Sequence, residues 1–411
     1  MPPKFKAPRG TFDVLPEQAA QRERLLRAAH EICGRSGYKN IATPSFEDTA
    51  LFERGVGEST DIVRKEMFTF EDKGGRSLTL RPEGTAPICR AYVEHGMHKL
   101  AQPVKLSYSG PFFRHERPQA GRYRQFHQIG AEAIGSDSPL ADVEVITLLS
   151  DLLEEMGVPG VELRLGSLGS LEARAAYLDE LKAHLRSRSD ELSEDVSERI
   201  EINPLRAFDS EHPGTQAVME DAPQLLDHLD QADSEHFEEV RQLLSAASVE
   251  FVIDPALVRG LDYYTRTIFS FVCDQLGAQS EIGGGGRYDG LIAQLGGPDT
   301  PAVGWAAGIE RILLALDEEV EVPAGDLFIA VESADQNSKA VALAAELRHH
   351  GLVVEIDLAG RSMKGQLKHA DRISAAHVLT LSNDGAASLR NRASNEIRDV
   401  QPADVLDLIR P

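Results

Sequence analysis

Residues 104–135, VKLSYSGPFFRHERPQAGRYRQFHQIGAEAIG, contain two strand-like segments joined by a polar connection. We predict strands over Lys105–Phe113 and Gln125–Ile134. The connection carries four arginines: Arg114, Arg117, Arg122 and Arg124. Side chains alternate along a strand, which places four residues of the second segment on one face: Phe126, Gln128, Gly130 and Glu132. An aromatic ring, an amide and a carboxylate beside a basic loop favour a ligand with a flat ring and an anion. An ordinary hairpin with a solvated basic loop fits this stretch equally well.

The composition is that of a globular protein with more than one domain. At 411 residues the chain is too long for a single core, and no apolar run reaches the roughly 18 residues of a membrane span. The first ten residues hold no apolar segment, so we expect no secretory signal. Cys33, Cys89 and Cys273 form no CxxC pair, which argues against a disulfide framework or structural zinc. We therefore expect a reducing, cytoplasmic location.

The acidic charge is unevenly distributed along the chain. The formal net charge is −23, whereas a generic nucleic-acid binder is basic, so DNA is not an expected partner. Residues 167–251 hold 20 acidic and 7 basic residues, and residues 326–411 hold 12 and 10. Contacts with a nucleic acid would therefore be confined to local patches.

Periodicity divides the chain into a large and a small domain. We predict a large domain over residues 1–325, in which a polar helical insertion at about 170–248 interrupts a sheet. Its other elements include a helix over Pro16–Ser36, strands over Tyr38–Pro44 and Val249–Ile253, and a helix from Thr85, whose hydroxyl could cap it. After an acidic linker, Glu318–Gly325, residues 326–411 alternate as β-α-β-α-β, which predicts a small α/β domain.

Four further stretches are rich in polar groups: Arg81–Thr85, Leu257–Thr265, Gly283–Gly290 and Gly304–Arg311. Each alone is weak. The glycine run lacks the GK[ST] of a phosphate-binding loop and by itself indicates a flexible loop. Two tyrosines are ordinary packing residues, and an arginine can form a surface ion pair. No Ser/His/Asp or Cys/His arrangement and no HExxH spacing is present, so we expect neither covalent nor zinc catalysis.

Together these stretches resemble the histidyl-tRNA synthetase family, a class II aminoacyl-tRNA synthetase family, over essentially the whole chain. Tyr38–Pro44 resembles class II motif 1, which builds a dimer interface. Phe113–Glu116 with Phe126 resembles motif 2, and Gly308–Arg311 resembles motif 3. The chain also has two segments that resemble peptides specific to the histidine enzymes, Leu257–Tyr264 and Gly283–Asp289. The resemblance implies an α/β fold: an antiparallel class II catalytic sheet flanked by helices, followed by an anticodon-binding domain over 326–411.

The resemblance implies that ATP activates L-histidine to histidyl-adenylate, and that the histidine then passes to the terminal adenosine of its tRNA. Three arginines would be catalytic. Arg114 would hold the α-phosphate and the substrate carboxylate. Arg259 would face the α-phosphate from the other side, where other class II enzymes use a further metal ion, and Arg311 would grip the γ-phosphate. Phe126 would stack under adenine, and Glu116 would read its amino group.

For the amino acid, the resemblance implies that Glu132 and Tyr264 bind the imidazole and that Glu83, Thr85 and Gln128 hold the α-amino end. The full expected histidine site is Glu83, Gly84, Thr85, Arg114, Gln128, Glu132, Arg259, Tyr263 and Tyr264. Arg287 and Tyr288 belong to the glycine-rich peptide, and their individual roles stay open.

The expected ligands are ATP with Mg²⁺, L-histidine and histidine tRNA, with no zinc, other bound metal or prosthetic group. A homodimer without membrane contact is expected. Arg361–Lys368, Arg390 and Arg392 could contact the tRNA, but a solvated helix face fits them as well. Two other readings remain: a synthetase-like regulatory subunit of ATP phosphoribosyltransferase, and a non-catalytic tRNA-binding domain. The former usually lacks the anticodon domain and parts of the histidine peptides, which this chain has.

Overall fold

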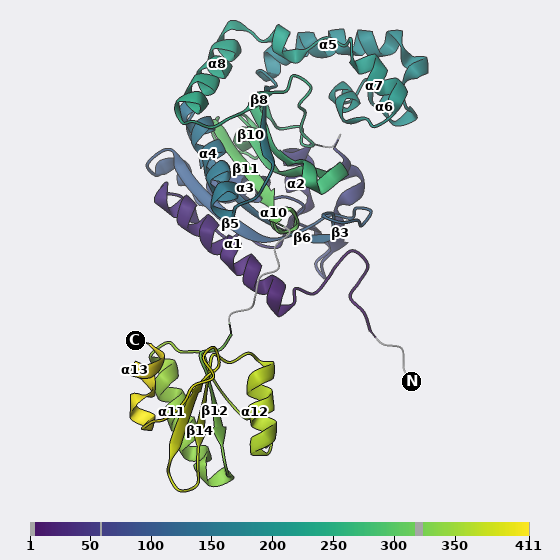
Figure 1. Cartoon of the computed structure of the whole chain (residues 1–411). Helices are drawn as coiled ribbons and strands as arrows, with labels where there is room; N and C mark the ends of the chain where they lie inside the picture. Colours follow the sequence, from purple (N-terminus) through teal and green to yellow (C-terminus); the bar gives the residue numbers. More distant parts are fainter. Residues whose placement is uncertain (1–4, 58–59, 317–323, 411) are drawn as a thin grey trace. The chain divides into compact units, whose positions relative to one another are not determined.

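The computed structural model describes residues 5–57, 60–316 and 324–410, and the chain forms two compact units, 1–320 and 321–411 (Figure 1). Each unit has hydrophobic clusters of its own. The acidic linker that we predict at Glu318–Gly325 lies, up to residue 323, outside the described residues. Within the described part of the chain, no helix is both long and apolar enough to cross a membrane.

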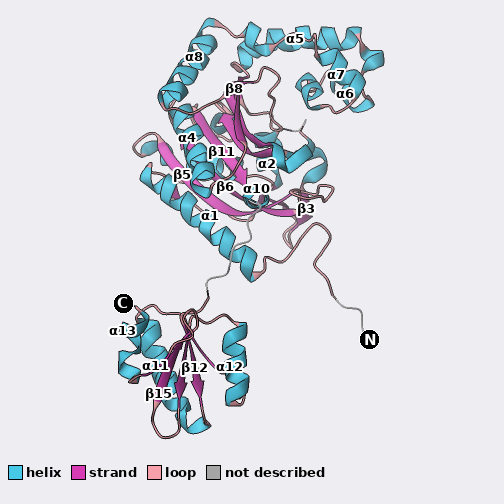
Figure 2. Ribbon diagram, in the orientation of Figure 1, coloured by secondary structure: helices cyan, strands magenta, loops and turns pink. Residues whose placement is uncertain are grey.

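The large unit is built on an eight-stranded sheet in the order β1-β5-β6-β11-β10-β9-β7-β8 (Figure 2). The pairs between β5 and β7 are antiparallel, and β1 and β8 each join an edge in parallel. The predicted fold class is confirmed. The strands are β1 (Lys39–Asn40), β5 (Val104–Phe113), β6 (Gln125–Ile134), β7 (Val161–Ser167), β8 (Val252–Ile253), β9 (Thr265–Cys273), β10 (Glu281–Arg287) and β11 (Ala302–Gly308).

The two edge strands are shorter than we predict from Tyr38–Pro44 and Val249–Ile253. The first residues of each predicted strand belong instead to the last turn of the helix that precedes it. The N–H of Tyr38 donates to Cys33 O at 2.9 Å, and the N–H of Val249 donates to Leu244 O at 3.0 Å. These bonds close the last turns of the helices and leave two residues each for the sheet.

One face of the sheet is covered by α1 (Pro16–Arg35), α4 (Pro139–Met156), α8 (Gln231–Ala246) and α10 (Ile309–Leu316). Helix α1 buries Leu25, Ala29 and Ile32, whose spacing places them on one helical stripe. Full burial of a leucine such as Leu25 contributes about 1.5–3 kcal/mol. From the sheet, Ile129 and Ala131 of β6 join this core.

The opposite face carries α3 (Thr85–Glu94) and a second cluster that includes Leu106, Tyr108 and Phe112 of β5. Nearby elements are α2 (Thr49–Val56), η1 (Ile62–Glu66), η2 (Met97–Lys99), α9 (Leu291–Gln294) and a small sheet of β2 (Phe46–Asp48), β4 (Ser77–Leu80) and β3 (Phe68–Glu71). The short turn η6 (Asp274–Gln279) lies instead against α10.

Helix α3 begins at Thr85 as predicted, but the predicted cap is wrong. The Thr85 hydroxyl donates to Glu132 Oε1 at 2.8 Å and does not cap the helix. The carboxylate of Glu83 caps it instead, because it accepts from the N–H groups of Thr85 and Ala86 at 2.7 and 3.0 Å. An anion is favourable at this end of a helix.

The glycine run Gly283–Gly286 is a strand and not a flexible loop, so the interpretation of that motif by itself is wrong. It forms most of β10, paired on both sides by β9 and β11. A Cβ at Gly285 would lie 1.9 Å from Gly304 O, and one at Gly284 would lie 2.6 Å from Phe269 O. Glycine is required because the neighbouring backbones approach too closely for a side chain.

The insertion contains α5 (Leu171–Ser187), η3 (Ser189–Glu191), α6 (Glu194–Arg199), η4 (Pro204–Asp209), α7 (Pro213–Met219), η5 (Leu225–His228) and α8, drawn in teal and green in Figure 1. Helix α8 packs on the same face of the large sheet as α4, where Phe237, Val240 and Leu244 enter the core. The helices α5 to α7 share the cluster on the other face. The insertion is therefore packed into the large unit at both of its ends.

The small unit has a five-stranded sheet in the order β13-β12-β14-β15-β16. Strands β12 (Leu327–Val331), β13 (Val354–Ile356) and β14 (His377–Leu381) are parallel, and β15 (Ala387–Asn391) and β16 (Ile397–Asp399) extend them in antiparallel fashion. One face packs on α11 (Asn337–His349) and α13 (Val405–Ile409), and the other on α12 (Met363–Arg372). Two short turns are η7 (Ala334–Gln336) and η8 (Pro402–Asp404).

Candidate active site

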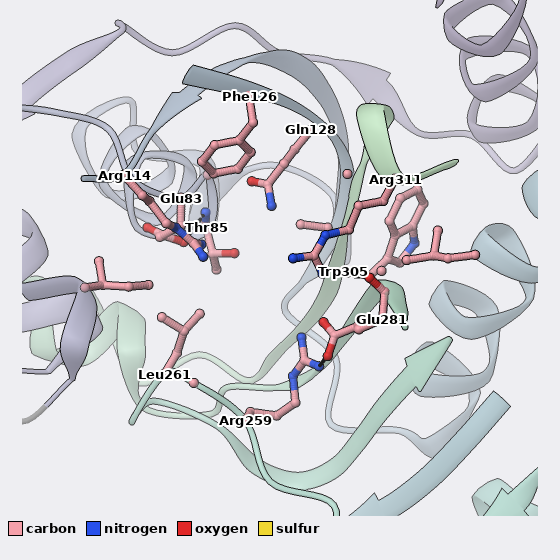
Figure 3. A pocket seen from close by; sticks show the side chains of 18 of the residues that line it. Glu83, Thr85, Arg114, Phe126, Gln128, Arg259, Leu261, Glu281, Trp305 and Arg311 are labelled. Atoms are coloured by element: carbon pink, nitrogen blue, oxygen red, sulfur yellow. Dashed lines mark hydrogen bonds and ion pairs between the residues drawn. The ribbon is translucent and has the colours of Figure 1, made fainter. Parts of the chain in front are cut away.

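A cavity of about 420 Å³ lies on the sheet face opposite α1 and α4. This volume is typical of a small-molecule site. Strands β6, β10 and β11 contribute residues to it, as do residues 83–85, the loop 258–264 and the start of α10. Figure 3 shows side chains from these separate segments pointing into one space.

The structure gathers around this cavity the residues that the sequence predicts for ligand binding, with the exception of Glu132. They lie in five separate segments of the chain, and the alternation along β6 is as predicted: Phe126 and Gln128 face the cavity and Ile129 faces the helices. The predicted residues that line the cavity are Glu83, Gly84, Thr85, Arg114, Glu116, Phe126, Gln128, Arg259, Tyr263, Tyr264 and Arg311.

Glu132 lies one layer behind the cavity wall and is fully buried. It accepts hydrogen bonds from the hydroxyls of Thr85 and Tyr288, at 2.8 and 2.6 Å, and both of these residues line the cavity. Burial raises the pKa of Glu132 to about 8, and the two hydroxyl donors offset only part of that effect. Near neutral pH the carboxyl is therefore mostly protonated.

Arg114 follows directly on β5 and is held in two ways. Its Nε donates to Pro82 O at 2.9 Å, and its guanidinium lies over the Phe126 ring, 5.3 Å from the centroid. Glu116, two residues further on, forms an ion pair with Arg122. The connection between β5 and β6 is therefore more than a solvated basic loop, because it presents an ordered cation and an aromatic ring to the cavity.

Arg259 and Arg311 converge on Glu281 (Figure 3). Arg259 Nη1 donates to Glu281 Oε2 at 2.9 Å, and Arg311 Nη1 donates to the backbone oxygen of Glu281 at 2.7 Å. Burial by itself raises the pKa of Glu281, but the charges of Arg259 and Arg311 outweigh it and the net shift is downward. Burial likewise acts to lower the pKa of Arg259, and Glu281 turns the net shift upward. Glu281 and Arg259 are thus both charged. The Glu281 carboxylate pairs with Arg259, and its backbone oxygen accepts from Arg311.

Among the polar residues that line this cavity, sequence reasoning misses Tyr108, Asp209 and Glu281, as well as Tyr123 and Ser280. The Tyr108 side chain fills the space over Gly84 and Gly130, where a Cβ would lie 2.5 Å or less from it. Its position in a predicted strand was a usable signal. Glu281 stands two residues before the first glycine of the run, and this position was another usable signal. Asp209 comes from the insertion, and nothing local to it indicates the site.

Arg287, in the glycine-rich peptide, has no exposed surface and does not line the cavity. It forms an ion pair with Asp142 and donates to Ser136 O and Ser138 O at 2.8 and 3.1 Å. Its role is to fix β10 against the start of α4. Tyr288, the next residue, is thereby held where its hydroxyl reaches Glu132.

Among the described residues, no group of three or more His, Cys, Asp or Glu side chains could hold a metal ion. A mainly antiparallel sheet whose open face gathers an aromatic ring and three arginines, followed by a separate α/β unit, is the arrangement of a class II aminoacyl-tRNA synthetase.

Comparison with known proteins identifies the family. Residues 10–312 match the family model described as Histidyl-tRNA synthetase, and residues 326–411 match that described as Anticodon binding domain. The chain belongs to the histidyl-tRNA synthetase family. A Histidine–tRNA ligase of Thermosynechococcus vestitus is 47% identical over 95% of this chain and 93% of its own length. One of Rubrobacter xylanophilus is 47% identical over 96% of each chain.

Solved structures agree. The crystal structure of apo S. aureus histidyl-tRNA synthetase has a TM-score of 0.83 at 34% identity and covers 99% of this chain and 100% of its own. A structure described as an ATP phosphoribosyltransferase regulatory subunit/histidyl-tRNA synthetase from Bacillus halodurans C has a TM-score of 0.70 at 24% identity, with 93% of this chain and 100% of its own covered. At that identity the second likeness concerns the fold alone.

Proposed function

We propose that this chain joins L-histidine to its tRNA in two steps. In the first, the histidine carboxylate attacks the α-phosphorus of ATP, a P–O bond forms, and pyrophosphate leaves. In the second, a hydroxyl of the terminal adenosine of the tRNA attacks the histidyl carbonyl, and AMP leaves. The observation that carries this proposal is the convergence of Arg114, Arg259 and Arg311 with both histidine peptides on one cavity.

The phosphate end of the cavity is assigned to the three arginines. Phosphoryl transfer depends on positioning and on cations that stabilise the developing charge. Arg114, fixed by Pro82 O and by Phe126, faces the α-phosphate, and Phe126 offers its ring to adenine. Arg259 faces the α-phosphate from the other side and Arg311 the γ-phosphate. Glu281 holds Arg259 in place until the phosphate, as a stronger anion, takes over the guanidinium.

The amino-acid end is assigned to the wall around α3. Glu83, Thr85 and Gln128 hold the α-amino group, and Gln128 Oε1 has no hydrogen-bond partner among the described residues. Tyr264 is assigned to the imidazole, and so is Glu132, which acts from behind the wall through the hydroxyls of Thr85 and Tyr288. Because the pKa of Glu132 is raised to about 8, its ionised form needs further donors. A ring N–H would supply one by way of these hydroxyls, and a ligand without that N–H would not.

The remaining assignments follow the family. ATP enters as its Mg²⁺ complex, and no prosthetic group or zinc is required. The chain acts as a cytoplasmic homodimer, with Tyr38–Pro44 and its helix at the interface. Residues 326–411 bind the anticodon region of the tRNA. The regulatory-subunit alternative is not favoured, because the chain matches Histidine–tRNA ligases over nearly its whole length.

The test is histidine-dependent exchange of pyrophosphate into ATP. The unmodified chain is expected to catalyse exchange that requires histidine, and Arg259→Ala is expected to lower its kcat by roughly 100-fold or more. Arg398→Ala, which removes an exposed arginine paired with Glu396 in the small unit, serves as the control and should exchange normally. Binding of histidine without any exchange would contradict the proposal and support a regulatory subunit.

A further inference from the structure

We propose that the helical insertion sets the position of Arg259, through Asn203 and Arg206 acting as positioning residues. This inference rests on the proposed function, because it concerns the adenylate step at the same cavity. It assigns to the insertion a part in the chemistry of the ATP site. Neither Asn203 nor Arg206 lines the cavity.

The loop that bears Arg259 is irregular and takes part of its shape from contacts with other segments. Residues 254–264 lie between β8 and β9 and form no helix or strand. Backbone groups in such a segment must find partners elsewhere, so its conformation is set by tertiary contacts. Arg259 has to present its guanidinium toward Glu281 and the cavity from this irregular backbone.

Asn203 and Arg206 supply such contacts immediately beside Arg259. Arg206 Nη2 donates to Gly260 O at 3.1 Å, and its Nη1 donates to Asp209 Oδ2 at 3.0 Å. Asn203 Nδ2 donates to Asp262 Oδ1 at 3.0 Å. The short helix η4 and the residue before it thus hold the loop at the first and third positions after Arg259.

The same part of the insertion is tied to other walls of the cavity. Arg199 forms an ion pair with Asp61, its two terminal nitrogens 2.8 and 3.3 Å from the carboxylate oxygens, next to the cavity residue Ile62. Arg174 of α5 donates to Tyr264 O at 2.6 Å, at the other end of the loop. The insertion therefore holds the second half of the loop at three positions, Gly260, Asp262 and Tyr264.

A shared hydrophobic cluster also packs the insertion against the loop that bears Arg259. Tyr177 and Leu181 of α5 belong to the same buried cluster as Tyr263 and Tyr264 of the loop. Asp209, held by Arg206, forms part of the cavity lining itself. A displacement of the insertion, such as a bound tRNA could impose, would therefore be transmitted to Gly260 and from there to Arg259.

The experiment measures kcat and KM for histidine-dependent pyrophosphate exchange in Arg206→Ala and in Asn203→Asp, which places a second carboxylate against Asp262 without changing volume. We expect kcat to fall about tenfold or more in each, because small misplacement of a reacting group is costly. The KM for histidine is expected to change less than threefold. Arg186→Ala, which removes an exposed ion pair with Glu201 inside the insertion, is the matched control and should leave kcat unchanged.

A double-variant cycle distinguishes positioning from general damage. If Arg206 acts through Arg259, then Arg206→Ala should lower the exchange rate little further in a chain that already carries Arg259→Ala. An undiminished effect in that background, or an unchanged kcat in both single variants, would overturn the inference. The unmodified chain separates the two proposals: absence of histidine-dependent exchange there defeats the proposed function, whereas normal exchange with insensitive variants defeats this inference alone.

Discussion

The side chain of Arg287 is the largest charged group with no exposed surface in the described chain, and Asp142 beside it is equally buried. Burial by itself raises the pKa of Asp142, but the hydrogen bond from His236 and the charge of Arg287 outweigh it and lower the pKa. A pair of this kind gives little net stability over an apolar pair, yet it is costly to break. At the scale of single residues, the position of the end of β10, next to Tyr288, therefore depends on the ion pair between Arg287 and Asp142.

Replacing Arg287 alone is predicted to be strongly destabilising. Arg287→Met should lower the free energy of unfolding by about 3–5 kcal/mol, because Asp142 is left with a buried charge that His236, 3.4 Å away, only partly compensates. The double variant Arg287→Met, Asp142→Leu should lose much less. Urea unfolding of both variants and of the unmodified chain provides the measurement. Equal losses in the single and double variants would contradict this account.

Glu132 predicts a pH dependence of stability. Its pKa is raised by burial from 4.5 to about 8, so between these values the folded chain keeps a proton that the unfolded chain releases. The stability contributed by this proton is complete below pH 4.5 and is lost as the pH rises to 8. Between pH 5 and pH 8 the free energy of unfolding of the unmodified chain should therefore fall by roughly 3–5 kcal/mol more than that of Glu132→Gln.

Unfolding free energies at pH 5 and pH 8 measure this difference. Glu198→Gln, which changes an exposed carboxyl of the insertion, should keep the slope of the unmodified chain. An unchanged slope in Glu132→Gln would show that the carboxyl is ionised throughout.

At the scale of elements, the glycine strand β10 explains how the sheet can be closely packed and still bear a cavity. Gly283 and Gly284 are part of the cavity lining, and Gly285 lies against the backbone of β11. Side chains at these positions would push β9, β10 and β11 apart. The strand is thus specified by close approach of its neighbours, which outweighs the low strand propensity of glycine.

Gly285→Ala is predicted to destabilise the large unit by about 1–3 kcal/mol or more, because its Cβ would lie 1.9 Å from Gly304 O, a backbone atom that cannot rotate away. Gly34→Ala in α1 is the matched comparison: its Cβ meets nothing within 4 Å, and alanine favours a helix by about 0.5–1 kcal/mol. Thermal unfolding should show the two substitutions shifting Tm in opposite directions. A Gly285→Ala chain as stable as the unmodified one would refute the steric argument.

At the scale of the whole molecule, the two compact units have separate hydrophobic clusters. Each core is built from residues of its own unit, so each has the means to fold alone. All residues that line the candidate active site belong to the large unit.

We predict that a chain ending at residue 320 keeps histidine-dependent pyrophosphate exchange within about threefold of the intact chain, since the cavity is complete within it. Charging of tRNA should fall by more than about tenfold, because one of two linked contacts with the same tRNA is removed. Parallel exchange and charging assays measure the two steps. Normal charging by the shortened chain would contradict a tRNA-binding role for residues 326–411.

Much of the fold can be predicted from local patterns in the sequence. The hairpin of β5 and β6, the helix α1, the β-α-β-α-β order of the small unit, and the alternation that turns Phe126 and Gln128 to one face follow from periods of 2 and 3.6 residues. The four polar stretches could be singled out because charged and aromatic residues stand there where a plain core would have none. These features depend on neighbours within a few residues, which a sequence displays directly.

Other features depend on distances between segments far apart in the chain, and no local pattern contains them. Gly283–Gly286 is a strand because β9 and β11 approach it, and Thr85 leaves its capping role because Glu132, 47 residues away, accepts its hydroxyl. Glu281 joins the site through two arginines, and Asn203 and Arg206 reach the Arg259 loop only after the insertion has folded back. The chemical groups are thus encoded in order along the chain, whereas their contacts arise from the energy of packing distant segments together.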